Sequence, residues 1–484
     1  RNGIECGRPP EGPEPHPRFE TAPGEQMQFD WKESLRMADA EGEVFEFNVF
    51  SATLGYSRLH RFVYSRTRTE DDVMACLLAV MAANYYGHPA DSMTMVAVTG
   101  TNGKTTTTYL LKAILEQELG AKVGLIGTNQ DLIGDEVVPT ERTTPESLEL
   151  QELFARMRSA GCTHVVMEAS SHALALDRVY GIHYAVGIFT NLTQDHLDFH
   201  KTMENYREAK ALLFTHLHEG RKKGKTAIFN MDDASSPLIM NRVKTKVMTY
   251  GKARTNDVYP IRFHVGAKHM ELSLHTPEGN MDLRLHITGE FNVYNVMTAV
   301  CAALAEGLKH DDIVRGLDNF AGVPGRFQLI DAGQPFTVIV DYAHTPDGLD
   351  NVLRTARQIT KGRLWAVFGC GGDRDAKKRP IMGKLALELA DILVVTSDNP
   401  RSEDPDTIIR DIETGFSDNP QHKEIYTISD RREAIQFAIS HARPEDVIMI
   451  AGKGHENYQI LKDRTIHFDD GEVVRDFFRK GNRA

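Results

Sequence analysis

Four short apolar runs set the pattern of the middle of the chain. They read MTMVAV, KVGLIGT, THVVMEAS and YAVGIFTN, they fall between Met93 and Asn191, and each ends in polar or glycine-rich residues. Short β-branched runs that alternate with helical patterns predict an α/β architecture with a largely parallel sheet. Because ligands bind beyond the carboxyl ends of the strands in such sheets, the residues after each run are candidate site residues.

The pattern changes to strict alternation of apolar and polar residues between about Lys246 and Gly289. The segments MELSLHT and MDLRLHI flank the turn residues PEGN, which predicts an antiparallel hairpin packed onto the same domain. A second α/β set follows, with strands predicted in FTVIVDYAH, RLWAVFGCGG, ILVVTSDNP and DVIMIAGKGHE. The stretch GVPGRF, from Gly322 to Phe327, separates the two sets and is the predicted hinge.

These patterns predict three regions in the 484 residues, a length that suits about three domains. We expect an atypical N-terminal region over residues 1–92, a central domain over 93–325 and a C-terminal domain over 326–484. Residues 1 to about 25 carry many Pro, Gly and Glu, which predicts a mobile tail.

Composition argues against a nucleic-acid-binding protein and against a membrane-spanning one. The net charge of −12 disfavours a nucleic-acid binder. The five cysteines are widely scattered and show no CxxC spacing, which is typical of reduced thiols in the cytoplasm. The longest apolar run, about Val73 to Ala83, is too short to cross a bilayer. We therefore expect a cytoplasmic protein without nucleic-acid or membrane partners. We also expect a monomer.

A phosphate-binding loop is predicted after the first central strand. The segment VAVTGTNGKTTTTYLLKAIL places Gly100, Gly103, Lys104 and Thr105 between a strand and an amphipathic helix. Backbone N–H groups of such a loop cradle phosphates, the lysine reaches the terminal phosphates, and the threonine hydroxyl binds Mg²⁺. The full GxxxxGK[ST] pattern needs glycine at position 98, where Val98 stands, so this is a variant loop.

A second candidate site combines histidines, carboxylates and one lysine. The segment DHLDFHKTMENYREAKALLF sets His196, Asp198 and His200 shortly before Lys210. Such a cluster suits a metal site or a solvated surface, yet an ammonium group repels cations. Glu168 in MEASSH follows one predicted strand and His196 follows the next strand along the chain, and the two could hold Mg²⁺ beside a triphosphate. Taken alone, a residue of either type is more often a helix cap or a satisfied polar group.

The motif TGTNGKTTTT resembles the signature of the Mur ligases, ATP-dependent amide-bond formers that include the folylpolyglutamate synthases. Further motifs follow in the family's order: TTPESLELQ, MEASSHALALDRV, IFTNLTQDHLDFH, YREAKALLF, GEFNVYN, VPGRF, VDYAHTPDGL, GCGGDRDAKKRP, SDNPRSEDP and GKGHENY. The resemblance implies the three-domain Mur ligase architecture, with a central P-loop ATPase domain and a C-terminal Rossmann-like domain. The branch resembled adds the third stem-peptide residue to UDP-N-acetylmuramoyl-L-alanyl-D-glutamate through an acyl phosphate, and DNPR is its signature for meso-diaminopimelate.

The resemblance also assigns roles near the ATP. The lysine of AK before LF is carbamylated by CO₂ in this family, which would convert Lys210 from a repelling cation into an oxygen ligand. Carbamylation needs a neutral amine, so the site must lower the lysine pKa. The implied catalytic residues are Lys104, Glu168, His196 and Lys210, and the implied Mg²⁺ ligands are Thr105, Glu168, His196 and Lys210.

Two sets of binding residues complete the implied site. The nucleotide set comprises Gly100, Thr101, Asn102, Gly103, Lys104, Thr105, Thr106, Asn292, Asn295, Arg326, Asp341 and His344. The substrate set comprises Thr143, Thr144, Ser170 and Arg178 for the uridine nucleotide, and Arg374, Asp398, Asn399, Arg401, Gly452 and Glu456 for the amino acid. In the amino-acid pocket, guanidinium groups suit a carboxylate and Glu456 suits an ammonium.

The N-terminal region departs from the branch. The uridine-binding domain expected there carries an SR…PGDLF pattern, whereas FVYSRTRTEDDV keeps only the Ser65–Arg66 pair. Three alternatives therefore stay open: a ligase acting on a different, non-UDP acyl substrate, a polyglutamate-adding ligase, and a non-catalytic homologue.

Overall fold

The computed structural model describes residues 27–38, 44–54, 60–65, 70–120, 122–140, 142–219, 222–318, 320, 322–416 and 422–481. The predicted tail over residues 1–25 and Arg66 lie outside the described residues. The chain divides into two compact units, Arg1–Met81 and Ala82–Ala484. Among the described helices, none is long and apolar enough to cross a membrane.

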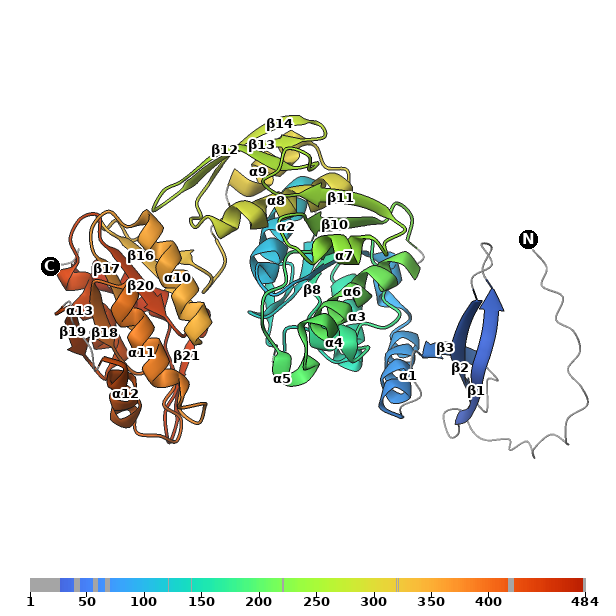
Figure 1. Ribbon diagram of the computed structural model, residues 1–484, viewed down its shortest axis with the longest axis horizontal. Helices are drawn as coiled ribbons and strands as arrows, with labels where there is room; N and C mark the ends of the chain where they lie inside the picture. The colour runs from blue at the N-terminus through green and yellow to red at the C-terminus, as the bar shows by residue number, and fades with distance from the viewer. Residues whose placement is uncertain are drawn as a thin grey trace, which may run out of the picture. The chain divides into compact units, whose positions relative to one another are not determined.

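The first unit contains an antiparallel sheet of three strands. Strands β1 (Met27–Ala38), β2 (Val44–Leu54) and β3 (His60–Ser65) lie in the order β1-β2-β3 (Figure 1). Helix α1 (Glu70–Tyr85) begins in this unit and ends in the second.

An eight-stranded sheet forms the centre of the second unit. Its order is β11 (Lys246–Tyr250), β10 (Thr226–Asn230), β9 (Val186–Phe189), β4 (Thr94–Thr99), β8 (Cys162–Glu168), β5 (Lys122–Ile126), β6 (Asp131–Ile133) and β7 (Glu136–Val138). The first six strands are parallel, and β6 and β7 continue the edge in antiparallel pairs. The predicted parallel sheet is confirmed.

Helices cover both faces of this sheet because side chains alternate along its strands. Val96 and Val98 of β4 pack in a core with α2 (Lys104–Leu119), α8 (Phe291–Ala305) and α9 (His310–Asp318). Met95 and Ala97 face the opposite core, whose helices are α3 (Ser147–Ser159), α4 (Ser171–Ala175), α6 (Met203–Glu219) and α7 (Ser236–Met240). The short helices η1 (Pro89–Ser92) and α5 (Leu197–His200) complete this part of the chain.

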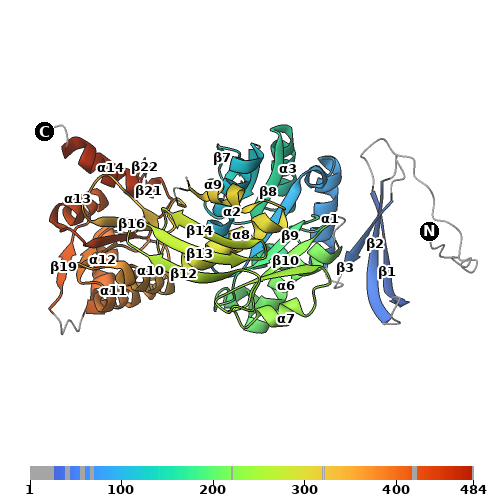
Figure 2. The same cartoon turned by 90° about the horizontal axis from the view of Figure 1, so that it is seen from above.

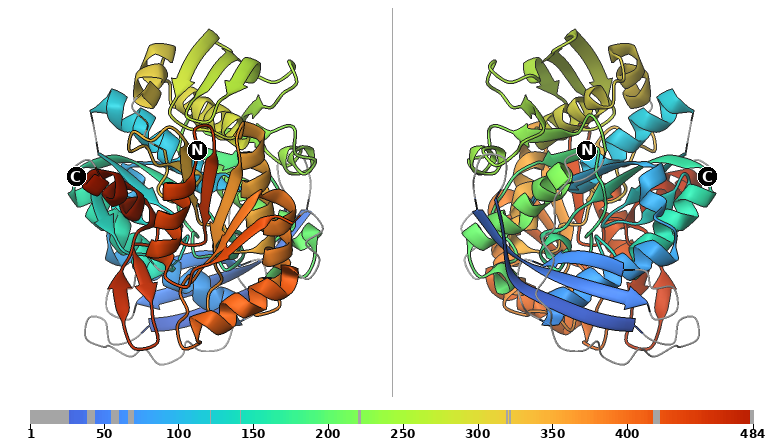
Figure 3. Two further views of the ribbon diagram at one scale, coloured as in Figure 1. Left: turned by 90° about the vertical axis from the view of Figure 1, so that its left-hand side faces the viewer. Right: turned by 90° about the vertical axis from the view of Figure 1, so that its right-hand side faces the viewer.

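The predicted hairpin is confirmed and gains a third strand. Strands β12 (Tyr259–Val265), β13 (Met270–Thr276) and β14 (Gly279–Leu285) form an antiparallel sheet. Apolar residues of β13 and β14, such as Leu272 and Leu283, belong to the same core as α2 and α8. Figure 3 shows this sheet lying over the yellow helices. The sequence did not predict β12, whose side chains are mostly exposed.

A second parallel sheet follows the hinge. Its order is β15 (Gln328–Leu329), β16 (Thr337–Asp341), β20 (Val447–Ala451), β17 (Leu364–Phe368), β18 (Ile392–Val395) and β19 (Glu424–Thr427), with β15 antiparallel. One core holds α10 (Pro346–Ile359), α11 (Lys378–Leu389) and α12 (Pro405–Glu413), and the other holds α13 (Arg431–His441) and α14 (Asp470–Gly481) (Figure 2). The turn η2 (Thr414–Phe416) and the hairpin β21 (Tyr458–Ile460) with β22 (Thr465–His467) complete the unit.

Candidate active site

The candidate ATP-binding residues gather where the central parallel strands end. Gly100 follows β4, Glu168 is the last residue of β8, and Thr190 follows β9. Since β4 pairs with both β8 and β9, these residues lie at one edge of the sheet. The phosphate loop therefore opens at the edge where α/β sheets bind ligands.

Residues after β9 hold the phosphate loop in shape. The Thr101 N–H donates to the Asn191 carbonyl at 2.9 Å, and the Asn102 N–H donates to Asn191 Oδ1 at 2.9 Å. The Thr190 hydroxyl donates to the Asn102 carbonyl at 2.7 Å. Sequence reasoning did not assign these roles to Thr190 and Asn191, although they stand in the motif IFTNLTQDHLDFH.

Helix α2 begins at the loop with Gly103 as its N-cap residue. The Gly103 φ of 85° lies in the left-handed region, and a Cβ there would collide with Asn295 Oδ1. Asn295 donates to Asn292 Oδ1 at 2.8 Å, and Asn292 donates to the Thr288 carbonyl at 2.7 Å. The predicted pair Asn292 and Asn295 therefore lies directly against the phosphate loop. Thr105 is buried and Thr106 half-buried in the first turn of α2.

Two lysines converge on one carbonyl of the loop. Lys104 Nζ donates to the Gly100 carbonyl at 3.0 Å, and Lys210 Nζ donates to the same oxygen at 2.7 Å. Lys210 is 1% exposed and its Nζ lies 4.5 Å from the centre of the Tyr206 ring. Burial, and then the charge of Lys104, lower the pKa of Lys210 well below its ordinary value, against the opposing effect of Asp195. Lys210 is therefore suited to hold a neutral amine inside the site.

Lys104 shares this environment. Its ammonium also donates to the Thr101 carbonyl at 2.9 Å. Burial lowers the pKa of Lys104, while the negative charge of Glu168 raises it and the positive charge of Arg326 lowers it.

Glu168 is fully buried and held by one threonine. Its Oε1 accepts the Thr128 N–H at 3.0 Å, and its Oε2 accepts the Thr128 hydroxyl at 3.0 Å. Thr128 follows β5, the neighbour of β8 in the sheet. Sequence reasoning did not identify Thr128, although its place after a predicted strand was the available signal.

His196 lies at the N-cap of α5 with a φ of 52° and 47% of its side chain exposed. Its Nε2 is 3.4 Å from Asp195 Oδ2, and its ring lies 4.9 Å from that of His172. His200 is buried, 2.9 Å from the Ser171 hydroxyl, and Asp198 is exposed. Among the described residues, no group of three or more His, Cys, Asp and Glu could hold a metal ion.

The predicted uridine-nucleotide residues form one cluster next to Glu168. The Thr144 hydroxyl donates to the Glu168 carbonyl at 2.8 Å and accepts the Ser170 N–H at 3.1 Å. The Thr143 hydroxyl lies 3.0 Å from that of Thr128. Arg178 contacts the Thr144 carbonyl at 3.4 Å and pairs with Glu146 at 2.9 Å.

The remaining residues predicted for the nucleotide lie in and after the segment GVPGRF. Asp341 accepts the Phe327 N–H at 2.7 Å and the Ala343 N–H at 2.8 Å, and burial raises its pKa. The Arg326 guanidinium lies 5.5 Å from the centre of the Tyr342 ring, and its buried Nε has no hydrogen-bond partner. His344 is exposed. Asp341 thus fixes the turn that presents Arg326.

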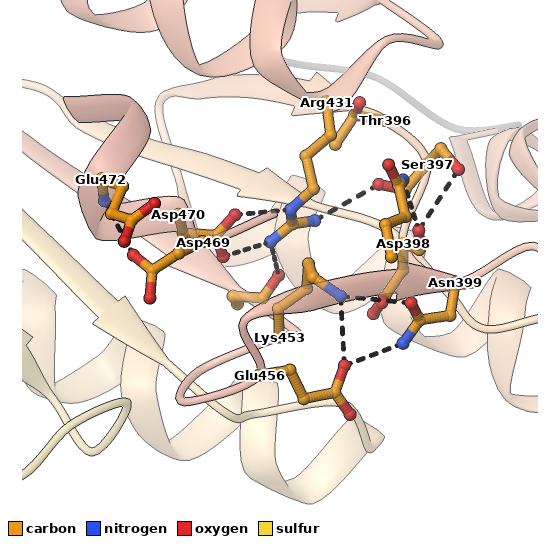
Figure 4. Close-up of polar contacts among 12 residues, drawn as sticks. Thr396, Ser397, Asp398, Asn399, Arg431, Lys453, Glu456, Asp469, Asp470 and Glu472 are labelled. Atoms are coloured by element: carbon orange, nitrogen blue, oxygen red, sulfur yellow. Dashed lines mark hydrogen bonds and ion pairs between the residues drawn. The ribbon is translucent and has the colours of Figure 1, made fainter. Parts of the chain in front are cut away.

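The predicted amino-acid residues gather where the strands of the second sheet end. Asn399 Nδ2 donates to Glu456 Oε2 at 2.8 Å (Figure 4). Gly452 has a φ of 121°, and a Cβ there would lie 2.7 Å from Asp398 Oδ2. Arg401 donates to the Gly372 carbonyl at 2.9 Å. Arg374 is exposed and forms no part of this network.

Two family models match the chain. The Mur ligase middle domain matches residues 98–303, and the Mur ligase glutamate ligase domain matches residues 325–454. A relative from Clostridium tetani, named UDP-N-acetylmuramoyl-L-alanyl-D-glutamate--2,6-diaminopimelate ligase, is 49% identical over 406 residues, 83% of this chain and 81% of the relative. A relative of the same name from Geobacillus thermodenitrificans is 48% identical over 400 residues, 82% of this chain and 81% of that one.

Solved structures give the same relationship. A structure of a UDP-N-acetylmuramoyl-L-alanyl-D-glutamate--2,6-diaminopimelate ligase is 34% identical with a TM-score of 0.64, covering 84% of each chain. The Mycobacterium tuberculosis folylpolyglutamate synthase shares the fold at 18% identity, with a TM-score of 0.63 over 84% of this chain and 95% of that one. By its matched domains and its extensive identity to named members, this chain belongs to the Mur ligase family.

Proposed function

We propose that this chain is an ATP-dependent ligase that joins meso-diaminopimelate to UDP-N-acetylmuramoyl-L-alanyl-D-glutamate during peptidoglycan precursor synthesis. The γ-phosphoryl group of ATP passes to a carboxylate of the muramoyl dipeptide, giving an acyl phosphate and ADP. An amine of meso-diaminopimelate then attacks the acyl carbon, forming the amide, releasing phosphate and losing a proton. Two small-molecule substrates and ATP therefore meet at the strand ends described above.

The observation that carries the proposal is the convergence of Lys104 and Lys210 on the Gly100 carbonyl, at 3.0 Å and 2.7 Å. Lys104 lies in the phosphate loop and supplies positive charge for the transferred phosphoryl group. Lys210 is buried beside it, where Lys104 already supplies a positive charge. A lysine held there as a neutral amine can act as a nucleophile.

We propose that Lys210 reacts with CO₂ to form a carbamate. Its neutral amine attacks the carbon of CO₂, a C–N bond forms, and one proton is released. Mg²⁺, on which ATP-dependent Mur ligases rely, neutralises phosphate charge when bound. Thr105, Glu168, His196 and the Lys210 carbamate would hold it, since hydroxyl, carboxylate and carbamate oxygens suit a hard cation.

The remaining assignments rest on the same clusters. Asn292, Asn295, Arg326, Asp341 and His344 complete the nucleotide site. The uridine-nucleotide and amino-acid sets serve the two other substrates. We propose domain boundaries at residues 92 and 325, and a cytoplasmic monomer with no membrane partner. We also propose no nucleic-acid partner, which the net charge of −12 supports.

The substrate assignment is tested by ADP release from the purified chain with ATP and Mg²⁺. We expect turnover with the UDP-muramoyl dipeptide and meso-diaminopimelate, and at least about a hundredfold lower kcat/KM with lysine, which lacks the second carboxylate. Turnover with a non-UDP acyl acceptor in place of the dipeptide would instead favour the alternative that the missing SR…PGDLF pattern suggests. Absence of turnover with every acceptor would favour the non-catalytic homologue.

The carbamate is tested separately with ¹³C-labelled bicarbonate. We expect a carbamate resonance in the carbon NMR spectrum of the chain that contains Lys210, and its loss in the Lys210→Ala variant. A Lys210→Ala variant with the ligase rate of the starting protein would rule out this role.

A further inference from the structure

The strand ends of the second sheet bury a lysine that the amino-acid set does not contain. Lys453 lies directly after Gly452 and is 0% exposed. Its ammonium donates to Asn399 Oδ1 at 3.1 Å and to Glu456 Oε2 at 3.1 Å (Figure 4). A buried charge is tolerated only where partners offset its desolvation. Its partners are two residues of the proposed amino-acid site.

Lys453, Asn399 and Glu456 form a closed triangle. Asn399 Nδ2 donates to Glu456 Oε2 at 2.8 Å, and the Ile460 N–H donates to Asn399 Oδ1 at 2.9 Å. One oxygen of Glu456 thus accepts two hydrogen bonds, and both ends of the Asn399 amide are engaged. Glu456 keeps 14% of its side chain exposed. The triangle therefore holds the carboxylate with one edge toward solvent.

Further buried charges surround the triangle. Arg431 and Asp470 form a fully buried ion pair with two contacts of 2.8 Å. Arg431 also donates to the Ala451 carbonyl at 3.1 Å. Asp398 is buried close to both Arg431 and Lys453, and burial raises its pKa.

Lys453 acts on two carboxyl groups of this cluster. It pairs with Glu456 at 3.1 Å, and its charge opposes the effect of burial on the pKa of Asp398. Without Lys453, both carboxyl groups would lose a nearby cation, and the Glu456 carboxylate would lose a donor that orients it.

We propose that Lys453 is a positioning residue that holds Glu456 and Asn399 in the geometry that receives an ammonium group of the diamino acid. This inference rests on the proposed function of the same pocket. Lys453 itself does not touch the amino acid. It acts through Glu456, so its removal affects the amino-acid substrate and leaves the two other substrates unaffected.

The test is steady-state kinetics of the full chain with Lys453→Met, which keeps the length of the apolar stem. Each of the three substrates is varied in turn at saturating concentrations of the other two, and ADP release is measured. We expect the KM for meso-diaminopimelate to rise at least about tenfold, while the KM values for ATP and the dipeptide change less than about twofold. An unchanged or lower KM for meso-diaminopimelate overturns the proposal, since a lysine that merely repels the ammonium gives that result.

A double-mutant cycle separates positioning from a general structural role. Glu456→Gln is expected to raise the KM for meso-diaminopimelate, and adding Lys453→Met should then change it by less than about threefold. Independent effects that multiply would contradict action through Glu456. If the starting protein shows no turnover with meso-diaminopimelate, the proposed function fails, and this is distinct from failure of the inference in an active enzyme.

Lys423→Met is the matched control. Lys423 donates to the carbonyls of Leu387 at 2.6 Å and Ala390 at 2.8 Å, so it anchors backbone in the C-terminal part of the chain and has no contact with Glu456. We expect it to lower the melting temperature without changing the KM for meso-diaminopimelate. If Lys453→Met does not fold, Lys453→Gln, which retains an N–H donor, is measured in its place. Failure of both variants to fold overturns the proposal, because it assigns Lys453 to the fold.

Discussion

At the scale of single residues, burial of Lys210 lowers the stability of the fold but favours the neutral amine that the proposed reaction with CO₂ needs. Its ammonium is 1% exposed and donates to the Gly100 carbonyl. The pKa of Lys210 in the folded chain lies well below its ordinary value because of burial and Lys104. Between these two pKa values the unfolded chain binds more protons, so the free energy of unfolding rises with pH across this window. Near neutral pH, unmodified Lys210 therefore destabilises the fold.

Lys210→Met should consequently stabilise the protein while abolishing ligation. The Gly100 carbonyl keeps its hydrogen bond from Lys104 at 3.0 Å, so the substitution leaves no orphaned acceptor. We expect the free energy of unfolding at pH 7.5 in CO₂-free buffer to rise by about 1–2 kcal/mol, with a smaller gain near pH 10. Urea unfolding at the two pH values measures both changes.

Lys112 supplies the control for this prediction. It is also buried, but it pairs with Glu116 one turn away on α2. Lys112→Met leaves that carboxylate without its cation, so a loss of stability is expected. Equal stabilisation by both substitutions would show that burial of any lysine, and not the site around Lys210, accounts for the effect.

At the scale of elements, helix α2 is capped at both ends by a glycine of positive φ. The surroundings of the two glycines differ. Gly103 has a φ of 85° and faces Asn295, whereas Gly120 has a φ of 55° with no atom near an added Cβ. Both positions disfavour an L side chain by about 1–2 kcal/mol. A collision is added at position 103 alone.

Gly103→Ala should therefore displace Asn295 and distort the phosphate loop. We expect the KM for ATP to rise at least about tenfold, a loss of about 1.4 kcal/mol in binding. Gly120→Ala should lower the melting temperature and leave the KM for ATP unchanged. A similar KM in both variants would mean that the contact with Asn295 has no part in nucleotide binding.

Elements with a strong local pattern were predictable from the sequence. The strands β4, β8 and β9, the turn from β4 into helix α2 and the hairpin β13–β14 each carry their signal within a few residues, and the structure confirms them. Strand β12 was missed because its exposed, irregular pattern is stabilised by pairing with β13. Family motifs in a fixed order made the Mur ligase assignment possible, and the matched domains confirm it.

Residues that act by supporting others were not predictable in the same way. Thr128, Asn191 and Lys453 are ordinary polar residues in sequence, and their roles depend on which strands lie side by side. Thr128 reaches Glu168 because β5 pairs with β8. Lys453 reaches Asn399 across 54 positions in the chain. Sheet order, which the sequence leaves open, decides these contacts.

At the scale of the whole molecule, all candidate site residues belong to the unit Ala82–Ala484, and the sheet β1-β2-β3 belongs to the other. Helix α1 runs from Glu70 to Tyr85 across the division, and its residues Cys76, Leu77, Ala79 and Ala82 are buried. A cut at position 82 divides this helix, whereas a cut before Glu70 keeps it intact.

A chain that begins at Glu70 should therefore fold and bind nucleotide as the full chain does. With ADP and Mg²⁺ at about one hundred times the Kd, linkage predicts about 2.7 kcal/mol of stabilisation for the full chain and the same for the shorter chain. Thermal unfolding with and without ligand measures this, and Gly103→Ala in the shorter chain should reduce the shift. A chain that begins at Ala82 keeps only the last four residues of α1, which are too few for a stable helix, so it should melt at a lower temperature. If the chain from Glu70 folds but ADP no longer stabilises it, then residues before Glu70 contribute to nucleotide binding. The inference that the nucleotide site belongs to the second unit alone would then be wrong.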